Sequence, residues 1–200
     1  MHQIKKFLPF VFALLAVLLI AGAALAQPAA APAEVTNLSI HIKNFGQMDA
    51  RFFRGAQPAK KDLRDLAALG INTVIDLRDD PKDYERTLVE SLGMKYVNIP
   101  MLGKQYPTQE ATDLFLKTVN DPSTGKFFVH CAGGRHRTGA MGAVYRFQFY
   151  NWTYEQAYQE MKHYDFYTQW GHAAFREFVK DYSAKFQAGK DAGSTKAQEK

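Results

Sequence analysis

The chain has 200 residues, 46% of them hydrophobic and 14% aromatic, a composition that excludes an intrinsically disordered protein. Its formal net charge is +5 and falls to +3 without Lys5 and Lys6, so the charge does not argue for a nucleic-acid partner and none is expected. Cys131 is the single cysteine, which excludes an internal disulfide.

The N-terminus has the layout of a secretory signal. A short basic start precedes an apolar run, and the run ends in an A-x-A sequence of small residues. We therefore expect a signal peptide at residues 1–26, a Pro/Ala-rich linker at 27–35, and export to the periplasm or the exterior. The alternative is an uncleaved anchor, because residues 7–26 are just long enough to span a bilayer. A membrane is an expected partner only in that case.

Strand and helix patterns alternate through residues 36–186, which we predict to be one domain. In chain order the patterns are strands at 38–42 and 51–55, a helix at 59–70, a strand at 71–77, a helix at 83–93, a strand at 95–101, a helix at 107–121, a strand at 125–130, and helices at 138–150, 153–166 and 171–186. This alternation predicts an α/β fold, with a central, mostly parallel sheet flanked by helices and a helical C-terminal third. We expect a disordered tail at residues 187–200.

The sequence FFVHCAGGRHRTGAM, residues 127–141, places Cys131 between a predicted strand and a predicted helix. Consecutive backbone N–H groups in such a loop, in front of a helix N-terminus, bind anions and most often phosphate. The same positive end, together with Arg137, is expected to lower the pKa of Cys131 and to favour the thiolate. A buried and inert cysteine is the alternative, but it leaves the glycine pair and the spacing to Arg137 unexplained.

The segment HCAGGRHRTG matches every fixed position of H-C-x-x-G-x-x-R-[ST]-G, the signature of the cysteine-dependent protein tyrosine phosphatase superfamily. The stretches FFRGAQP, INTVIDLRDD and YVNIPM extend the resemblance to compact dual-specificity-type members, over residues 52–182. The RHRTG ending resembles plant and fungal atypical dual-specificity phosphatases, some of which act on inositol pyrophosphates, and their bacterial relatives. The resemblance implies a phosphatase whose substrate is a protein phosphorylated on tyrosine, serine or threonine, or an inositol polyphosphate.

The resemblance also implies a role for each residue of the loop. Cys131 would be the nucleophile that forms a phosphocysteine intermediate, and Arg137 would bind two phosphate oxygens through its planar fork. Thr138 would donate a hydrogen bond to the thiolate, and His130 would order the loop. No cofactor and no metal are implied. Backbone N–H groups would hold the phosphate at Ala132, Gly133, Gly134, Arg135, His136 and Arg137.

The proton donor for the leaving group is where the sequence departs from the family. The family places an aspartate on the loop that here reads PMLGKQYPTQE, and Glu110 is the only carboxylate of that loop. Asp76 and Asp79, at the end of the strand predicted at 71–77, are the other candidates. A third possibility is that no side chain donates the proton, which suits a good leaving group such as an aryl oxide or another phosphate. We favour the third.

Extra basic residues near the loop suit a substrate with several phosphates, although basic side chains on exposed loops are also ordinary. They are Arg135, His136, Lys60, Lys61 and Lys104. His163 and His172 lack the spacing of metal ligands and are interpreted as packed or surface residues.

Two competing functions stay open. A phosphate-binding pseudophosphatase is suggested by the missing acid, but Cys131 and Arg137 are both intact. A different thiol enzyme, an arsenate reductase or a sulfurtransferase, is the other. The first of these normally needs further cysteines, and the second does not require the pair Arg137-Thr138.

Overall fold

The computed structural model describes residues 40–198, with side chains described as far as residue 192. The predicted signal peptide at 1–26 and the predicted linker at 27–35 lie outside the described residues. Among residues 40–198, none of the helices combines the length and the apolarity that crossing a membrane requires.

A five-stranded sheet in the order β1-β2-β5-β3-β4 lies at the centre of the described residues. The strands are β1 (Gly46–Gln47), β2 (Phe52–Ala56), β3 (Thr73–Arg78), β4 (Lys95–Met101) and β5 (Phe127–Cys131). The short β1 pairs antiparallel with β2, and all other neighbours pair in parallel. The predicted fold class, a mostly parallel sheet flanked by helices, is therefore confirmed. The carboxyl ends of β2 to β5 meet at one edge, where α/β proteins bind their ligands.

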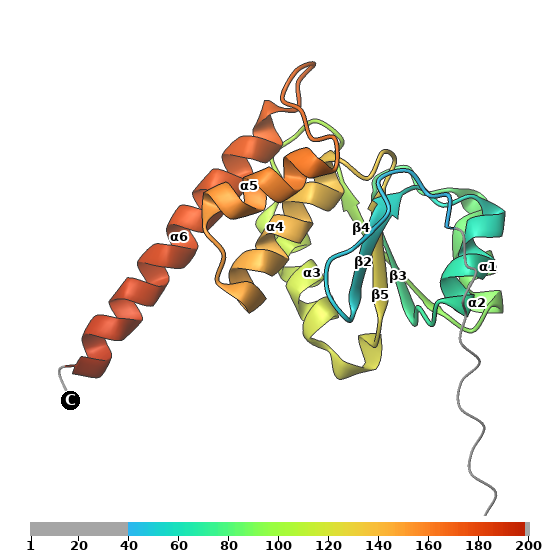
Figure 1. Cartoon of the computed structure of the whole chain (residues 1–200), viewed down its shortest axis with the longest axis horizontal. Coiled ribbons are helices and arrows are strands. Elements are labelled where there is room, and N and C mark those ends of the chain that lie inside the picture. The colour runs from blue at the N-terminus through green and yellow to red at the C-terminus, as the bar shows by residue number, and fades with distance from the viewer. Residues whose placement is uncertain (1–39, 199–200) are drawn as a thin grey trace, which may run out of the picture. The chain divides into compact units, whose positions relative to one another are not determined.

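Helices cover both faces of this sheet (Figure 1). On one face lie α1 (Lys60–Ala68) and α2 (Asp83–Ser91), and on the other lie α3 (Gln109–Asn120), α4 (His136–Tyr150), α5 (Tyr154–His163) and α6 (Ala173–Gln198). A short 3-10 helix, Pro122–Thr124, precedes β5. Each face has its own buried apolar cluster, so the sheet separates two cores.

The central strand β5 explains how the two cores are divided. Every residue of its sequence FFVHC is buried, as expected of a parallel strand that is covered on both sides. Because side chains alternate along a strand, Val129 and Cys131 join the core under α3 to α6, whereas Phe128 joins the core under α1 and α2. His130 stacks on Phe128 and lies on that second face. Cys131 and His130 are neighbours in sequence but lie on opposite faces.

Two local predictions were wrong. The strand predicted at 38–42 is absent over its described part, residues 40–42, because the chain turns at Lys43 and Asn44, the latter with a left-handed φ of 54°. Ile42 is apolar because it packs on the sheet, not because it belongs to it. The disordered tail predicted from residue 187 is helical as far as Gln198. Once residues 173–186 have packed and formed a helix, extending that helix requires no new nucleation.

Candidate active site

The loop that contains the sequence motif lies at the carboxyl edge of the sheet. Cys131 is the last residue of β5 and is 3% exposed, and α4 begins at His136. The helix begins two residues earlier than the predicted Thr138, so Arg137 and Thr138 both lie in its first turn. The thiol therefore faces a helix N-terminus, where unpaired N–H groups and the helix dipole favour an anion.

The loop is fixed from its outer side by the segment from residue 44 to residue 57. Three consecutive carbonyl oxygens accept hydrogen bonds from this segment: Ala132 O from the Gln57 N–H at 3.3 Å, Gly133 O from Asn44 Nδ2 at 2.8 Å, and Gly134 O from Arg54 Nη2. In a trans peptide the C=O and the N–H point in opposite directions. The N–H groups that follow these carbonyls therefore point toward the inside of the loop, where a phosphate would bind.

Gly134 allows the loop to lie directly on β2. Its φ is +66°, and a Cβ at this position would stand 2.5 Å from the carbonyl carbon of Gly55. No other residue fits there without moving one of the two backbones. Gly133 differs, because a Cβ there would meet only the Arg135 side chain, at 3.8 Å. Of the glycine pair, Gly134 is the one that the backbone requires.

The surroundings of Cys131 favour the thiolate. Burial raises the pKa of the thiol, but hydrogen bonds from the hydroxyl and the N–H of Thr138, the charge of Arg137 and the N–H of Gly133 outweigh it, so the pKa is lowered. The Thr138 hydroxyl is buried and forms no hydrogen bond by geometry within the described residues, so its proton is available to the nearby sulfur. A thiolate is the reactive form of cysteine, so the site is chemically suited to nucleophilic attack.

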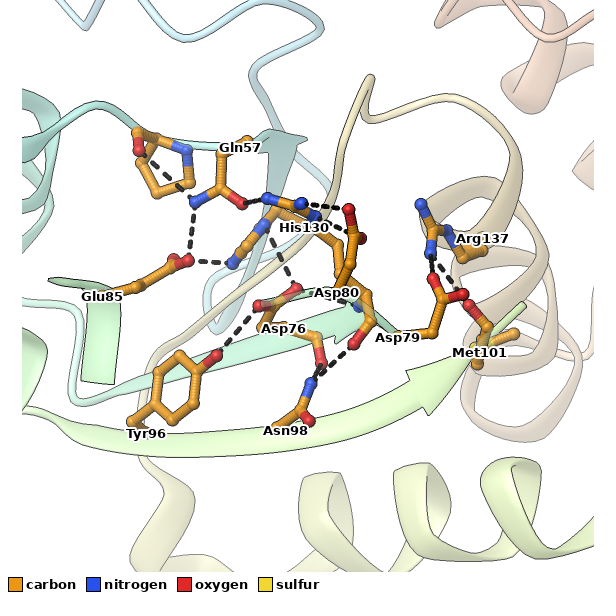
Figure 2. Close-up of polar contacts among 12 residues, drawn as sticks. Gln57, Asp76, Asp79, Asp80, Glu85, Tyr96, Asn98, Met101, His130 and Arg137 are labelled. Atoms are coloured by element: carbon orange, nitrogen blue, oxygen red, sulfur yellow. Dashed lines mark hydrogen bonds and ion pairs between the residues drawn. The ribbon is translucent and has the colours of Figure 1, made fainter. Parts of the chain in front are cut away.

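The guanidinium of Arg137 is held by the loop after β3 and by the end of β4 (Figure 2). Its Nη1 donates to Asp79 Oδ1 at 2.7 Å, on the loop after β3, and to the carbonyl of Met101 at 2.8 Å, at the end of β4. Gly103 lies against the same group, since a Cβ there would be 3.9 Å from the guanidinium. These contacts orient a planar fork that matches the oxygens of a phosphate.

His130 takes part in a separate buried network behind the loop (Figure 2). Its Nε2 lies 2.9 Å from Glu85 Oε1 and its Nδ1 lies 3.8 Å from Asp76 Oδ1, and all three side chains are fully buried. Burial lowers the pKa of His130, but Glu85, Asp76 and Cys131 outweigh it, so the pKa is raised. The three side chains bring possible metal ligands within 4.8 Å of one another. However, each ring nitrogen faces a carboxylate, which suits an imidazolium with two protons better than a metal ligand.

The structure separates the three candidate acids. Asp76 is buried, where burial raises its pKa, and its carboxylate accepts from the Tyr96 hydroxyl and faces His130 rather than the pocket. Glu110 is exposed in the first turn of α3, where hydrogen bonds from its own N–H and from Thr108 lower its pKa. Of the three, only Asp79 contacts Arg137, as an acceptor from its guanidinium.

The extra cations around the loop are less available than the sequence suggested. His136 Nε2 lies 3.0 Å from the Tyr167 carbonyl, and its ring stacks on His172 at 3.7 Å. Burial, followed by His172, lowers the pKa of His136 to about 4, so this residue is neutral at physiological pH. Arg135 Nη2 pairs with Asp165 at 3.5 Å. His136 therefore adds no positive charge near the loop, and the charge of Arg135 is partly balanced by Asp165. Both side chains contact the segment 165–172.

The three lysines expected near the loop have different surroundings. Lys104 is exposed and lies on the same loop as Gly103, and its side chain packs along Gly171. Lys60 and Lys61 begin α1, where Lys60 Nζ lies 5.3 Å from the ring centre of Tyr84. His163 is exposed, as interpreted from the sequence.

Several residues that build the site were missed by the sequence analysis. Asn44, Arg54 and Gln57 bind the carbonyls of the loop, and Glu85 binds His130. A charged residue inside the apolar stretch FFRGA was a usable signal for Arg54, because unpaired charge is rare in a buried strand. Nothing in the local sequence marks Asn44 or Glu85, since each acts on a residue far away in the chain.

Known proteins resemble this chain over most of the described domain. The family model described as a DSP-PTPase phosphatase fused to NAD+ kinase matches residues 33–181. The dual specificity protein phosphatase TpbA of Pseudomonas aeruginosa is 24% identical over 120 residues, which are 60% of this chain and 54% of that protein. The inositol diphosphatase DSP2 of Oryza sativa subsp. japonica is 26% identical over 134 residues, 60% of this chain and 61% of that protein.

Solved structures show the same fold. The core catalytic domain of the PP-IP phosphatase SIW14 from S. cerevisiae superposes with a TM-score of 0.62 at 22% identity, over 76% of this chain and 94% of that one. The structure of P. aeruginosa TpbA gives a TM-score of 0.59 at 22% identity, over 70% and 84% of the two chains. The matched region spans only part of the length of the curated relatives, 54% of TpbA and 61% of DSP2.

Proposed function

The chain belongs to the DSP-PTPase phosphatase family, and from this premise we propose that it is an exported phosphatase that hydrolyses phosphate monoesters through a phosphocysteine intermediate. One observation carries the proposal. A buried thiol with a lowered pKa lies at the base of a loop whose outer carbonyls are tied down and whose N–H groups point inward, beside the oriented fork of Arg137. This arrangement suits attack on phosphorus.

The reaction proceeds in two displacements. The Cys131 thiolate attacks phosphorus, the S–P bond forms, and the P–O bond to the leaving group breaks with its electron pair on the leaving oxygen. Water then attacks phosphorus, the S–P bond breaks, and inorganic phosphate leaves while the thiolate is restored and a proton passes to solvent. Arg137 and the loop N–H groups stabilise the negative charge on the phosphoryl oxygens in both steps. Thr138 stabilises the thiolate as it departs.

We propose that no side chain is dedicated to protonating the leaving group. Asp79 is bound to Arg137, Asp76 faces His130, and Glu110 lies exposed in the first turn of α3. General acid catalysis contributes about 10²–10⁴-fold in rate, and this contribution matters most for a poor leaving group such as an alkoxide. We therefore expect aryl phosphates and substrates with a phosphate leaving group to be hydrolysed faster than a serine phosphate.

The substrate class follows from the same reasoning. TpbA is named a dual specificity protein phosphatase, and DSP2 is named an inositol diphosphatase. We propose that this chain acts on a phosphorylated protein or on an inositol polyphosphate. Phosphotyrosine expels a phenolate and an inositol diphosphate expels a phosphate, and both leaving groups are less basic than the alkoxide of a serine phosphate. Both substrates are therefore compatible with a site that has no proton donor.

Phosphate release by the protein purified from expression of the full chain tests the proposal. The substrates are p-nitrophenyl phosphate, phosphotyrosine and phosphoserine peptides, and inositol polyphosphates with and without a diphosphate, and Cys131→Ser is the control. Turnover that disappears in Cys131→Ser, with trapping of a phosphorylated native protein on acid quench, is the expected result. The intact mass of the purified protein tests export, because a chain that begins at Gln27 is expected after cleavage.

The alternative function is that of a phosphate-binding pseudophosphatase. In that case inorganic phosphate and the substrates bind to the native protein, and none of the substrates is hydrolysed. Binding without turnover on the whole panel would overturn the proposal and leave a phosphate-binding module.

A further inference from the structure

Arg54 differs from the other buried arginines of the structure. Arg78 pairs with Asp80, Arg137 pairs with Asp79, and Arg146 pairs with Glu160. Arg54 is 1% exposed in the middle of β2, and among the side chains of residues 40–192 no carboxylate forms an ion pair with it. A buried charge without a counter-charge is costly, so the position of this guanidinium requires a physical reason.

The guanidinium lies directly under the loop that follows Cys131. Its Nη2 donates to the carbonyl of Gly134, its carbon atom lies 3.9 Å from the ring centre of Tyr164, and its Nε has no partner among the described residues. Arg54 pairs with Val129 in the ladder between β2 and β5. Because side chains alternate along a strand, Arg54 lies on the same face of the sheet as Cys131.

The charge of Arg54 is coupled to the thiol. Burial lowers the pKa of Arg54 to about 10, and negative charge on Tyr164, Cys131 and Glu160 acts in the opposite direction. At physiological pH the guanidinium is therefore protonated and attracts a thiolate at Cys131. The attraction is mutual, and in a site shielded from water it is stronger than between exposed groups.

We infer that Arg54 is a positioning residue whose buried positive charge, which forms no ion pair with a carboxylate among residues 40–192, is balanced by the anions of the active site, the Cys131 thiolate and the bound phosphate. It also fixes the Gly134 peptide, so that the N–H of Arg135 points into the pocket. The inference rests on the proposed function only in taking Cys131 as the nucleophile. Arg54 acts through the loop and through its charge, without touching the substrate.

Ionisation of Cys131 gives a direct readout, because the chain has no other cysteine. The rate of alkylation by iodoacetamide is measured against pH on the full chain, and its midpoint reports the pKa of the thiol. Iodoacetamide is uncharged, so removing a positive charge does not change its encounter with the site. Inorganic phosphate is then added as the probe, and the concentration that protects Cys131 by half reports anion binding. Neither measurement needs turnover.

Arg54→Met is the main variant, and Arg146→Met is its matched control. Arg146 is also buried, at 6% exposed, but it is compensated by Glu160 at 2.6 Å. In Arg54→Met we expect the midpoint to rise by about 1 pH unit, which is a tenfold change in the ionisation constant. We also expect roughly tenfold weaker protection by phosphate, in keeping with that shift. In Arg146→Met we expect both quantities to stay at the native values.

The other groups that act on the thiol are the same in both variants. Arg137 and Thr138 of α4 act on it from the same face, and His130 acts on it from the opposite face of β5. Tyr164 and Glu160 face Arg54 from the side of α5, and Glu160 loses its partner in Arg146→Met, so the two variants also differ at this carboxylate. The comparison separates the loss of the charge beside the loop from the loss of a buried arginine in general.

Arg54→Lys separates charge from positioning. It keeps a positive charge but cannot hold the Gly134 carbonyl with a fork, so we expect a native midpoint with weaker phosphate protection. It also carries the test if Arg54→Met does not fold, as checked by circular dichroism. A midpoint in Arg54→Met no higher than in Arg146→Met, or a raised midpoint in folded Arg54→Lys, would overturn the inference. A protein without phosphatase activity that still shows the expected shifts would refute the proposed function alone.

Discussion

Two buried cationic groups beside the loop, His130 and Arg54, lie on opposite faces of the sheet and are compensated in opposite ways. On the face covered by α1 and α2, the imidazole of His130 lies between Glu85 and Asp76 (Figure 2). On the face covered by α3 to α6, Arg54 has no carboxylate partner among the described side chains, and Cys131 lies on this face. The charge of His130 is balanced by carboxylates of the protein behind the loop, whereas we infer that the charge of Arg54 is balanced by anions in front of it. Variants that disturb each face test this difference.

Glu85→Gln breaks the balance on the α1/α2 face and has the largest expected effect. It removes one carboxylate from a buried ion pair, which costs roughly 3–5 kcal/mol of unfolding free energy. Urea unfolding at pH 7 measures the loss. Glu90→Gln is the matched control, because Glu90 is on the same helix with a 53% exposed side chain paired to Arg86, and we expect it to cost less than about 0.5 kcal/mol. Equal losses in the two variants would contradict the comparison.

The pH dependence of that loss has a defined sign. Burial lowers the pKa of His130, but Glu85 outweighs it, so the folded-state pKa exceeds the unfolded one. The resulting stabilisation is complete below the unfolded pKa, about 6.5, and is lost as the pH rises through the folded pKa. We expect the stability difference between native protein and Glu85→Gln to shrink as the pH rises. Measuring both in a Cys131→Ser background removes the thiol titration, and a difference that grows with pH would refute the assignment.

Arg137→Lys weakens the anion site on the opposite face. Lysine keeps the charge but lacks the fork that binds two phosphate oxygens. We expect kcat on p-nitrophenyl phosphate to fall roughly 10²–10³-fold, the usual effect of losing one preorganised donor to the transition state. Steady-state kinetics measures it. Arg135→Lys is the control within the same loop, since the Arg135 side chain pairs with Asp165, and a comparable fall there would show that the loss is not specific to the fork of Arg137.

Thr138→Ala removes an uncharged hydrogen-bond donor to the Cys131 thiolate. Burial raises the pKa of Cys131, and the Thr138 hydroxyl is the strongest group that opposes it. Hydrogen bonds to charged groups contribute about 1.5–3 kcal/mol, so we expect the alkylation midpoint to rise by about 1–2 pH units. Thr138→Ser keeps the hydroxyl and should retain the native midpoint. A rise in both variants would assign the effect to packing.

Asp79→Asn has the smallest expected effect and decides between two roles for this carboxylate. As a partner that orients Arg137, its loss should lower kcat/KM less than about tenfold, by the same factor for aryl and alkyl phosphates. A proton donor would instead cost about 10²–10⁴-fold, and mainly on alkyl phosphates. Glu110→Gln, on the exposed first turn of α3, should leave both rates unchanged.

Much of the fold was predictable from the sequence because its signals are local. The continuous apolar runs of β3 and β5 and the helical spacing in α1, α3 and α4 depend on neighbouring residues only. The two errors arose where a tertiary contact overrode the local pattern. Ile42 is buried in a turn instead of a strand, and the polar residues after residue 187 continue a helix that packing had already formed.

The sequence by itself determined the loop within residues 130–139, because these ten adjacent residues bring their own geometry: a strand end, a glycine with left-handed φ and a helix start. Only the tertiary structure decided what surrounds that loop. Asn44 and Arg54 reach it across 89 and 80 residues of chain, and Glu85 on α2 reaches His130 on β5. It also decided that His136 is neutral. The physical reason is that hydrogen bonding and charge state depend on burial and on neighbours in space, which the local sequence pattern does not encode.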